Sequence, residues 1–424
     1  MMTMDVAGMQ LSDDEVAAAG MTQAPAAQVP ALVQRHGRWW CERCGQTNLV
    51  RLPDGRWYCP HCVVLGRLTS TSQLYRFANA AATAGPLTWH GQLTPAQAQA
   101  AREVTAAALA RRDHLVWAVT GAGKTELLFL AVAAVLARGE RVAWASPRVD
   151  VVLELAPRLQ AAFATTPVAV RYGGAPWPSV AAPLVVTTTH QLLRYYHAFG
   201  LIIVDEIDAF PYAAESGLAY AVQQAKLGAM IALTATPSAT LRRAVSRQTI
   251  GVSRLTRRFH GHPLPVPQLQ LVRAAQLPNR LAPRLLRQIA RALVGAGRLL
   301  LFVPAVAWLS VVARQLQQLG HVATVHATDP ARQAKVQALR RGAVDILVTT
   351  TILERGVTIP HCAVMVLGAN SPLFSAAALI QMAGRAGRAS TSPDDPVWFV
   401  TPHVTRNVLA ARREIRALNR AVAP

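Results

Sequence analysis

Residues 114–126 read HLVWAVTGAGKTE, an apolar run of strand length followed at once by a glycine-rich turn. Glycines let the backbone N–H groups of such a turn wrap a pyrophosphate at the start of the next helix. Lys124 is suited to neutralise the β- and γ-phosphates, and Thr125 to ligate Mg²⁺. The stretch therefore predicts an ATP-binding loop consisting of Thr120, Gly121, Ala122, Gly123, Lys124, Thr125 and Glu126.

Further apolar runs of strand length lie on both sides of this loop. RVAWASP (141–147), VAVRYG (168–173), LVVTTT (184–189), GLIIVDE (200–206) and AMIALTAT (229–236) form the first series. After the proline-rich HGHPLPVPQ (260–268), a second series comprises RLLLFVP (298–304), VATVHA (322–327), VDILVTT (344–350), CAVMVLG (362–368) and VWFVTP (397–402). Apolar strands that alternate with helices indicate parallel sheets covered on both faces. The chain of 424 residues is therefore predicted to form two α/β domains, 88–255 and 256–424.

Two short polar strings follow strands of the first series. Asp205 ends the run GLIIVDE and is suited to hold Mg²⁺, while Glu206 beside it can polarise the attacking water. Thr234 and Thr236 in TATP are interpreted as a hydroxyl coupling between the nucleotide and domain motion. Gln97, near the start of a helix predicted from LTPAQ, is a candidate for reading the adenine edge. A glutamine on a helix surface is the plainer alternative.

The string QMAGRAGR at 381–388 predicts a second group of nucleotide contacts. Gln381, Arg385 and Arg388 follow a helical pattern, and the two arginines are spaced so that both could reach a γ-phosphate held on the other domain. Glu354 and Gly356 in TTTILERGVTIP are expected to complete that face. The plainer alternative for the arginines is surface charge near a helix end.

The charge of the chain indicates a polyanionic partner. The net charge is +21, and residues 216–328 contain no Asp or Glu. Clustered Arg attracts phosphate and gains from counterion release, although a GC-rich coding bias would also raise the Arg content. Hydroxyl and backbone contacts are expected to grip DNA phosphates without reading bases. The residues predicted for this role, on the rim opposite to the nucleotide, are Pro147, Arg148, Thr188, Thr189 and Thr350.

Four of the five cysteines form two CxxC pairs. Cys41, Cys44, Cys59 and Cys62 have the spacing of a zinc ribbon, in which four thiolates give a closed tetrahedral Zn²⁺ site. A redox pair or buried free thiols are the alternatives. Aromatic and basic residues around the ribbon, predicted for residues 38–75, suit stacking on single-stranded bases and equally suit packing of a small module.

The N-terminal segment contains no recognisable secretory signal. Residues 1–37 are poor in basic residues and rich in Ala, Gln, Met and Pro, and they are expected to be a disordered leader. The longest apolar run, 127–137, is about half of what a bilayer requires. We therefore expect a cytoplasmic protein with reduced cysteines; peripheral attachment at the inner face of the cell membrane stays open.

The motifs taken together resemble those of a known group. AVTGAGKT, ASPR, TTTHQLLR, DEID, TATP, TTTILERGV and QMAGRAGR look like the ordered motifs of superfamily 2 helicases, which implies two tandem RecA-like domains. More narrowly, DEIDAFPY (205–212), RRFHGHPLPVP (257–267), TTTILERGVTIP (349–360) and a preceding four-cysteine ribbon resemble the ComFA family of late-competence proteins.

The ComFA resemblance implies an ATP-dependent single-stranded DNA translocase that drives DNA import during natural transformation, with ATP, Mg²⁺ and Zn²⁺ as cofactors. It implies as partners single-stranded DNA, the membrane DNA-uptake channel, a phosphoribosyltransferase-like competence protein and single-strand processing factors. A homo-oligomer is a further option.

Two other functions fit some of the same motifs. A duplex-unwinding DNA helicase of the replication-restart kind shares the motor core and zinc cysteines, but such proteins carry wedge or winged-helix additions. An ATP-gated DNA clamp or adaptor would use hydrolysis only for release. Strand-separation and protein-displacement assays distinguish these functions from translocation.

Overall fold

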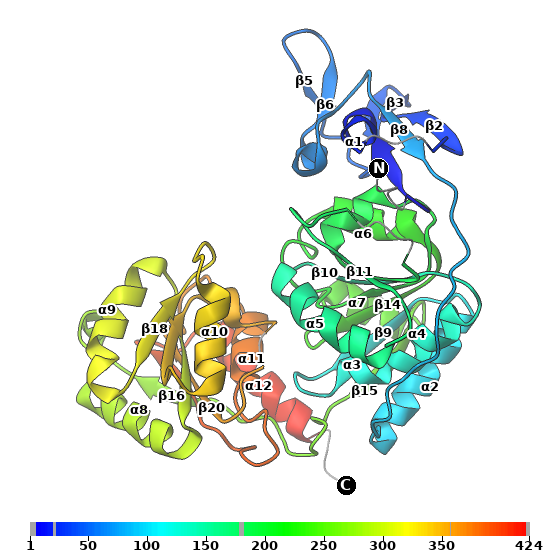
Figure 1. The fold of residues 1–424 in the computed structure, drawn as a ribbon. Helices are drawn as coiled ribbons and strands as arrows, with labels where there is room; N and C mark the ends of the chain where they lie inside the picture. Colours follow the sequence, from blue (N-terminus) through cyan, green and yellow to red (C-terminus); the bar gives the residue numbers. More distant parts are fainter. Residues whose placement is uncertain (1–5, 20–22, 178–181, 357, 421–424) are drawn as a thin grey trace. The chain divides into compact units, whose positions relative to one another are not determined.

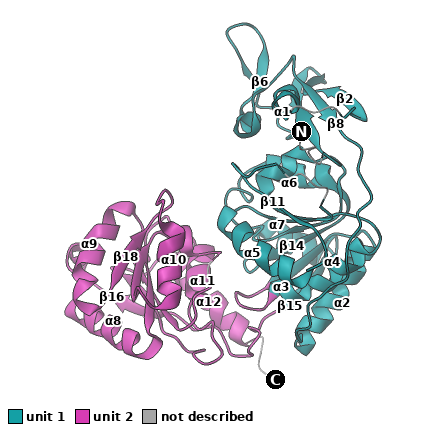
Figure 2. Ribbon diagram, viewed as in Figure 1, with its two compact units in different colours: residues 1–117, 124–254 teal, residues 118–123, 255–424 magenta. Residues whose placement is uncertain are grey.

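The computed structural model describes residues 6–19, 23–177, 182–356 and 358–420 (Figure 1). The chain divides into two compact units, one containing residues 1–117 and 124–254, the other 118–123 and 255–424 (Figure 2). Residues 118–123 belong to the second unit because their backbone bonds to it: Val119 N donates to Leu255 O, and Phe259 N donates to Gly121 O, both at 3.0 Å. The tip of the phosphate loop is thus described with unit 2.

Unit 1 contains a seven-stranded sheet with the strand order β11-β12-β10-β13-β14-β9-β15. The strands from β11 to β9 run parallel, and β12 and β13 are buried along their whole length, as expected for a sheet covered on both faces. The strands are β9 (His114–Ala118), β10 (Val142–Ser146), β11 (Val168–Arg171), β12 (Leu184–Thr188), β13 (Phe199–Val204), β14 (Lys226–Thr234) and β15 (Gly251–Leu255).

Helices that pack on this sheet begin at clear signals. Thr94 caps α2 through a reciprocal capping box with Gln97, and Pro95 is the first helical residue. The helices of this part are α2 (Pro95–Leu109), α3 (Lys124–Leu127), α4 (Phe129–Leu136), α5 (Val149–Ala162), the 3-10 helix η2 (Thr189–Arg194), α6 (Ser216–Ala225) and α7 (Ala239–Ser246). Helices α2 and α6 lie against β14, and α5 lies against β12.

Unit 2 contains a six-stranded parallel sheet with the order β16-β21-β20-β17-β19-β18. Its strands are β16 (Gln268–Leu271), β17 (Arg298–Phe302), β18 (Val322–Val325), β19 (Ile346–Thr349), β20 (Cys362–Leu367) and β21 (Val397–Thr401). Its helices are η3 (Ala274–Gln276), α8 (Pro283–Ala296), α9 (Val306–Leu316), η4 (Gln317–Leu319), α10 (Arg332–Arg341), η5 (Thr351–Leu353), α11 (Ala376–Ala383) and α12 (Arg406–Arg420). Every apolar run predicted from the sequence is a strand, and the predicted class of two parallel-sheet domains is confirmed.

The N-terminal segment differs from the expectation of a disordered leader, which is wrong for the described residues. Its strands β1 (Gln10–Ser12) and β2 (Ala27–Pro30) both pair with β8 (Gln73–Arg76), and α1 (Asp13–Ala18) lies between them. Leu11 is fully buried in the same core as Phe199 of β13. The segment is ordered by the later strand β8, with which both of its strands pair, so its local composition did not predict this.

The cysteine-containing part is built from very short elements. These are β3 (Leu32–Arg35), β4 (Arg38–Cys41), β5 (Val50–Arg51), β6 (Trp57–Cys59), the 3-10 helix η1 (Pro60–Leu65) and β7 (Leu68–Thr69). Elements of two to six residues bury little apolar surface, so such a module depends on additional cross-links.

A buried ion cluster joins the leader, the cysteine part and the sheet of unit 1. Glu15 of α1 accepts hydrogen bonds from Arg43, which lies between two cysteines, and from Arg194 of η2, the latter at 2.5 Å. Arg43 is fully buried. Burial alone would raise the pKa of Glu15, but the two guanidiniums outweigh it and hold that pKa below its usual 4.5. The three residues fix these segments to one another.

Candidate functional site

The phosphate loop has the backbone conformation that its glycines permit. Gly121 has a φ of +82° and Gly123 a φ of +70°, in the left-handed region that residues with a Cβ disfavour. Lys124 and Thr125, the first two residues of α3, are half-buried. The segment behind the loop forms two helices, because α3 ends at Leu127 and α4 begins at Phe129.

Glu126, predicted at the nucleotide, has a protein partner. Its carboxylate forms an ion pair with Arg158 of α5. This pair ties the first turn after the phosphate loop to a helix that packs on β12. A role of Glu126 at the nucleotide stays a prediction.

The acidic pair lies where the parallel strands end. Asp205 follows β13, and its backbone N–H donates to Ala145 O of β10 at 2.8 Å. Glu206 N donates to the Asp205 carboxylate at 2.8 Å, and Glu206 itself has a φ of +55°. A non-glycine residue in this region is strained, which is common at functional sites. Because β9, β13 and β14 are parallel, Lys124, Asp205 and Thr234 all come at the carboxyl edge of one sheet, where ligands of α/β proteins bind.

Asp208, the last residue of DEID, is a site residue that the sequence analysis missed. Thr234 Oγ1 donates to Asp208 Oδ1 at 2.7 Å, and Thr236 Oγ1 donates to the other carboxylate oxygen. Thr236 N in turn donates to Thr234 Oγ1 at 2.9 Å. The TATP threonines therefore bond directly to the acidic turn. The sequence did contain a signal for this link. A second acid lies three residues after Asp205, and two threonines lie two residues apart at the end of β14.

Gln97 serves first as a helix cap. Its Oε1 accepts from Thr94 N at 2.9 Å, and the residue is 6% exposed. Adenine recognition by Gln97 remains a prediction.

The segment with two arginines begins at the end of α11, within unit 2. Gln381 is buried in that helix, and Arg385 in the turn after it is 5% exposed. Arg388 folds back: its Nε donates to Gly384 O at 3.1 Å and its Nη1 to Thr358 Oγ1 at 2.9 Å. The two arginines are therefore in different surroundings, one buried and one held at the surface.

Gly384 brings this segment against the phosphate loop. A Cβ added at Gly384 would lie 2.1 Å from Thr120 Oγ1, a distance that no packing allows. Both residues belong to unit 2, so Thr120 and the turn that carries Arg385 are in contact there. A glycine is required at 384 for this approach.

The predicted pair Glu354 and Gly356 flanks the buried Arg355. Arg355 Nε lies 3.6 Å from Glu354 Oε1, and Gly356 has a φ of +68°. The glycine is thus required by the backbone turn after η5. A position of Glu354 and Gly356 at the nucleotide remains a prediction.

The residues predicted to bind DNA are at a different edge than expected. Pro147 and Arg148 follow β10, and Thr188 and Thr189 follow β12; both strands run parallel to β13. These residues therefore lie at the same carboxyl edge of the sheet as Asp205, after strands on the β11 side of β13. The expectation that they lie on an opposite rim is wrong. The reason is that every crossover between these strands returns the chain in the same direction.

Burial separates the predicted DNA contacts into two kinds. Arg148 is half-buried and lies 3.6 Å from Asp150, and Thr350 is half-buried in unit 2. Pro147, Thr188 and Thr189 are buried, and Thr189 is fully so. The DNA contacts remain predictions.

The four predicted cysteines come together in one buried cluster. All four Sγ atoms lie within 4.8 Å of one another, with Cys41 and Cys62 at 3.7 Å and Cys44 and Cys59 at 3.5 Å. A tetrahedral zinc site with Zn–S bonds of about 2.3 Å has sulfur atoms about 3.8 Å apart. The donor set and its spacing therefore fit Zn²⁺. Cys362 is buried in β20, outside this cluster.

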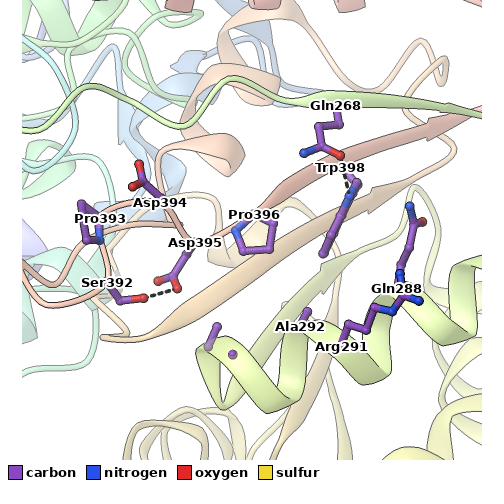
Figure 3. Close-up of a pocket in the computed structure, with 12 residues that line it drawn as sticks. Gln268, Gln288, Arg291, Ala292, Ser392, Pro393, Asp394, Asp395, Pro396 and Trp398 are labelled. Atoms are coloured by element: carbon purple, nitrogen blue, oxygen red, sulfur yellow. Dashed lines mark hydrogen bonds between the residues drawn. The ribbon is translucent and has the colours of Figure 1, made fainter.

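Unit 2 also has an open pocket that contains none of the predicted site residues. The cavity, about 490 Å³, lies between α8 and the segment that leads into β21 (Figure 3). Trp398, whose Nε1 donates to Gln268 at 3.2 Å, forms one wall, and Asp395 is held by Ser392 at one end.

Known proteins match the chain over both sheets. Residues 94–244 match the DEAD/DEAH box helicase family, and residues 283–390 match the helicase conserved C-terminal domain. Among solved structures, Dbp5 of S. cerevisiae bound to RNA and ADP BeF3 has a TM-score of 0.54 at 17% identity, covering 77% of this chain and 91% of that one. The Mycobacterium smegmatis helicase Lhr bound to ssDNA and AMP-PNP has a TM-score of 0.57 at 20% identity, covering 78% of this chain and 48% of that one.

These motifs and two parallel-sheet units define a superfamily 2 helicase-type enzyme that hydrolyses ATP. Competence protein ComFA of Bacillus subtilis (strain 168) is 39% identical over 401 residues, which is 91% of this chain and 87% of that protein. Competence protein ComFA of Streptococcus pneumoniae (strain ATCC BAA-255 / R6) is 38% identical over 409 residues, which is 93% of this chain and 94% of that protein. The chain belongs to the ComFA family: it is a competence-related, helicase-like ATPase with DNA as a partner.

Proposed function

We propose that this ATPase moves along single-stranded DNA and drives DNA import during natural transformation. The observation that carries the proposal is the similarity to two competence proteins over about nine-tenths of the chain. The positions of the phosphate loop and of Asp205 at the ends of parallel strands support it, because those are the places where a motor of this class binds its nucleotide.

The chemistry assigned to the site residues is phosphoryl transfer to water. Lys124 and the amides of residues 120–123 bind the phosphates, and Thr125 and Asp205 are the residues that would hold Mg²⁺. Glu206 accepts the proton of the attacking water. Gln381, Arg385 and Arg388 sense the terminal phosphate, and Glu354 and Gly356 complete that face. Gln97 binds the base.

Binding of the DNA phosphates is assigned to the carboxyl edge of the sheet in unit 1 and to Thr350. Pro147, Arg148, Thr188 and Thr189 follow two adjacent strands there, and their backbone amides suit phosphate contacts that carry no sequence preference. Around the cysteines, Trp40 packs edge-on against Tyr220 with centroids 5.9 Å apart, which assigns that ring to packing. Trp39 and Trp57 form a half-buried pair that is the better candidate for stacking on bases.

The protein partners and the location follow from the family alone. We propose the membrane DNA-uptake channel, a phosphoribosyltransferase-like competence protein and single-strand processing factors as partners, at the cytoplasmic face of the membrane. None of the described helices has the length and apolar character needed to span a bilayer.

The test is ATP turnover measured with single-stranded DNA, duplex DNA and RNA, combined with displacement of a protein block from a single strand. We expect stimulation by single-stranded DNA and ATP-dependent displacement, both lost in Lys124→Ala and kept in Lys335→Ala. Robust separation of blunt or forked duplexes would favour the restart-type helicase. DNA binding and ATP turnover without displacement would indicate a clamp.

A further inference from the structure

Arg258 is a buried arginine of the string RRFHGHPLPVP (257–267), and no role for it follows from the sequence alone. It lies in the segment between the two sheets, and it is 2% exposed. Its Nη1 donates to Gly387 O, but among the described residues its Nε and Nη2 have no hydrogen-bond partner. A buried guanidinium with two unsatisfied donor groups is costly, since each such group loses its water without replacement.

The surroundings of Arg258 are the phosphate loop and the turn with the two arginines. Its Cγ, Cδ and Nε would lie 3.6 to 3.8 Å from a Cβ added at Gly121. On the other side, a Cβ at Gly387 would lie 2.8 Å from Arg258 Nη1. All these residues belong to unit 2, so Arg258 is inserted between the phosphate loop and the turn after Gly384.

Arg258 has a second buried arginine beside it. Burial and the nearby Arg385, itself 5% exposed, lower the pKa of Arg258 to about 10, while Asp395 opposes both. The Asp395 carboxylate is already engaged, because it accepts from Cys362 N at 2.9 Å and from Ser392 Oγ (Figure 3). His260, which also faces Gly387 O, adds no anion. A buried guanidinium with two unsatisfied donor groups beside a phosphate loop calls for an external oxyanion.

We propose that Arg258 is a third arginine of the nucleotide site and donates to a phosphate oxygen of ATP beside Gly121. Its Nη1 bond to Gly387 O orients the guanidinium, and the two remaining donor groups face the oxyanion. Arg258 thus joins the phosphate loop and the turn that carries Arg385 to the same phosphates. The proposal rests on ATP hydrolysis by the chain and not on translocation, so a failure of DNA translocation would leave it intact.

The experiment uses the full chain with three variants: Arg258→Gln, Arg258→Lys and, as a matched control, Arg284→Gln, which removes an exposed arginine of α8 in the same unit. Affinity for a fluorescent ATP analogue with Mg²⁺, affinity for a fluorescent oligo-dT, and the melting temperature with and without ATP are measured. A charge-assisted hydrogen bond of about 1.5–3 kcal/mol corresponds to a loss of roughly 10- to 150-fold in affinity.

We expect Arg258→Gln to weaken ATP binding by at least about tenfold, to reduce the ATP-induced rise in melting temperature, and to leave oligo-dT binding unchanged. Its melting temperature without ATP should stay equal or rise, because a repulsive buried charge is removed. Arg258→Lys, which keeps the charge, should recover part of the affinity. An unchanged ATP affinity with a lower melting temperature would make Arg258 a structural residue, and a loss confined to oligo-dT would assign it to DNA phosphate; either result overturns the proposal.

Discussion

Thr234 Oγ1 donates a hydrogen bond of 2.7 Å to Asp208 Oδ1, which ties the end of β14 to the turn after β13. That turn begins with Asp205 and Glu206, so a movement of the acidic pair is transmitted to the TATP string through one carboxylate. Coupling of this kind needs a physical link between two neighbouring strand ends, and Asp208 provides it with bonds to both Thr234 and Thr236.

We predict that Asp208 and Thr234 are energetically coupled. Asp208→Asn and Thr234→Val, singly and together, should give a coupling energy of about 1–3 kcal/mol in the unfolding of unit 1, because the bond joins a hydroxyl to a charged group. Urea unfolding measures it. The pair Asp208→Asn and Thr105→Val, whose hydroxyl bonds to Ala101 O in α2, should be additive. A coupling energy near zero for the first pair would contradict the link.

Glu206→Gln should keep ATP binding and lose turnover. A general base contributes about 10²- to 10⁴-fold to rate, and the amide cannot accept the proton of water. Equilibrium binding of an ATP analogue and the steady-state release of phosphate measure the two properties. Glu414→Gln on α12 is the matched control and should retain turnover. Hydrolysis at the wild-type rate in Glu206→Gln would rule out the assignment of this carboxylate as the base.

Cys41→Ser should lose Zn²⁺ and unfold the cysteine part. Structural zinc supplies roughly 10–16 kcal/mol to small modules of this kind. Elemental analysis of the purified protein and thermal melting provide the measurements. Cys362→Ser, outside the cluster, should retain a full complement of zinc. If Cys41→Ser also bound one zinc per chain, Cys41 would not be a ligand.

Glu15→Gln should destabilise unit 1 at neutral pH and much less in acid. The lowered pKa of Glu15 means that its ionised form contributes stability above the unfolded value of 4.5 and loses it as the pH falls through the lower folded value. Removing one partner of a buried ion pair costs about 3–5 kcal/mol at pH 7. Urea unfolding at pH 7 and pH 4 should show a gap between wild type and variant that shrinks in acid. A gap that stays constant between the two pH values would mean that the charge of Glu15 does not stabilise the fold.

Most of the two sheets could be predicted from the sequence because their strands are buried on both faces. Runs such as GLIIV at 200–204 contain no polar side chain, and this composition predicts a buried strand. β16, with the pattern QLQL and only one buried residue, carries no such signal and was not predicted. The same holds for β15 (GVSRL), a strand at the edge of the sheet with only two buried residues.

The site was predictable where a motif fixes the backbone. Gly121 and Gly123 have the left-handed conformation that the phosphate-loop pattern requires, and the four cysteines meet as their spacing indicates. Asp208 and Arg258 were missed because their roles depend on partners far away in sequence, Thr234 and Gly387. The leader was missed for the same reason, since β1 and β2 have their partner strand in β8.

The Glu15 cluster has a consequence for how this enzyme can be dissected. Trimming the first 37 residues as an expression tail would delete the one carboxylate that Arg43 and Arg194 share. Arg43 beside the cysteines and Arg194 of η2 would then be left without this carboxylate. A shortened protein would then misreport both zinc content and DNA affinity, so biochemical work on this enzyme should retain its amino terminus.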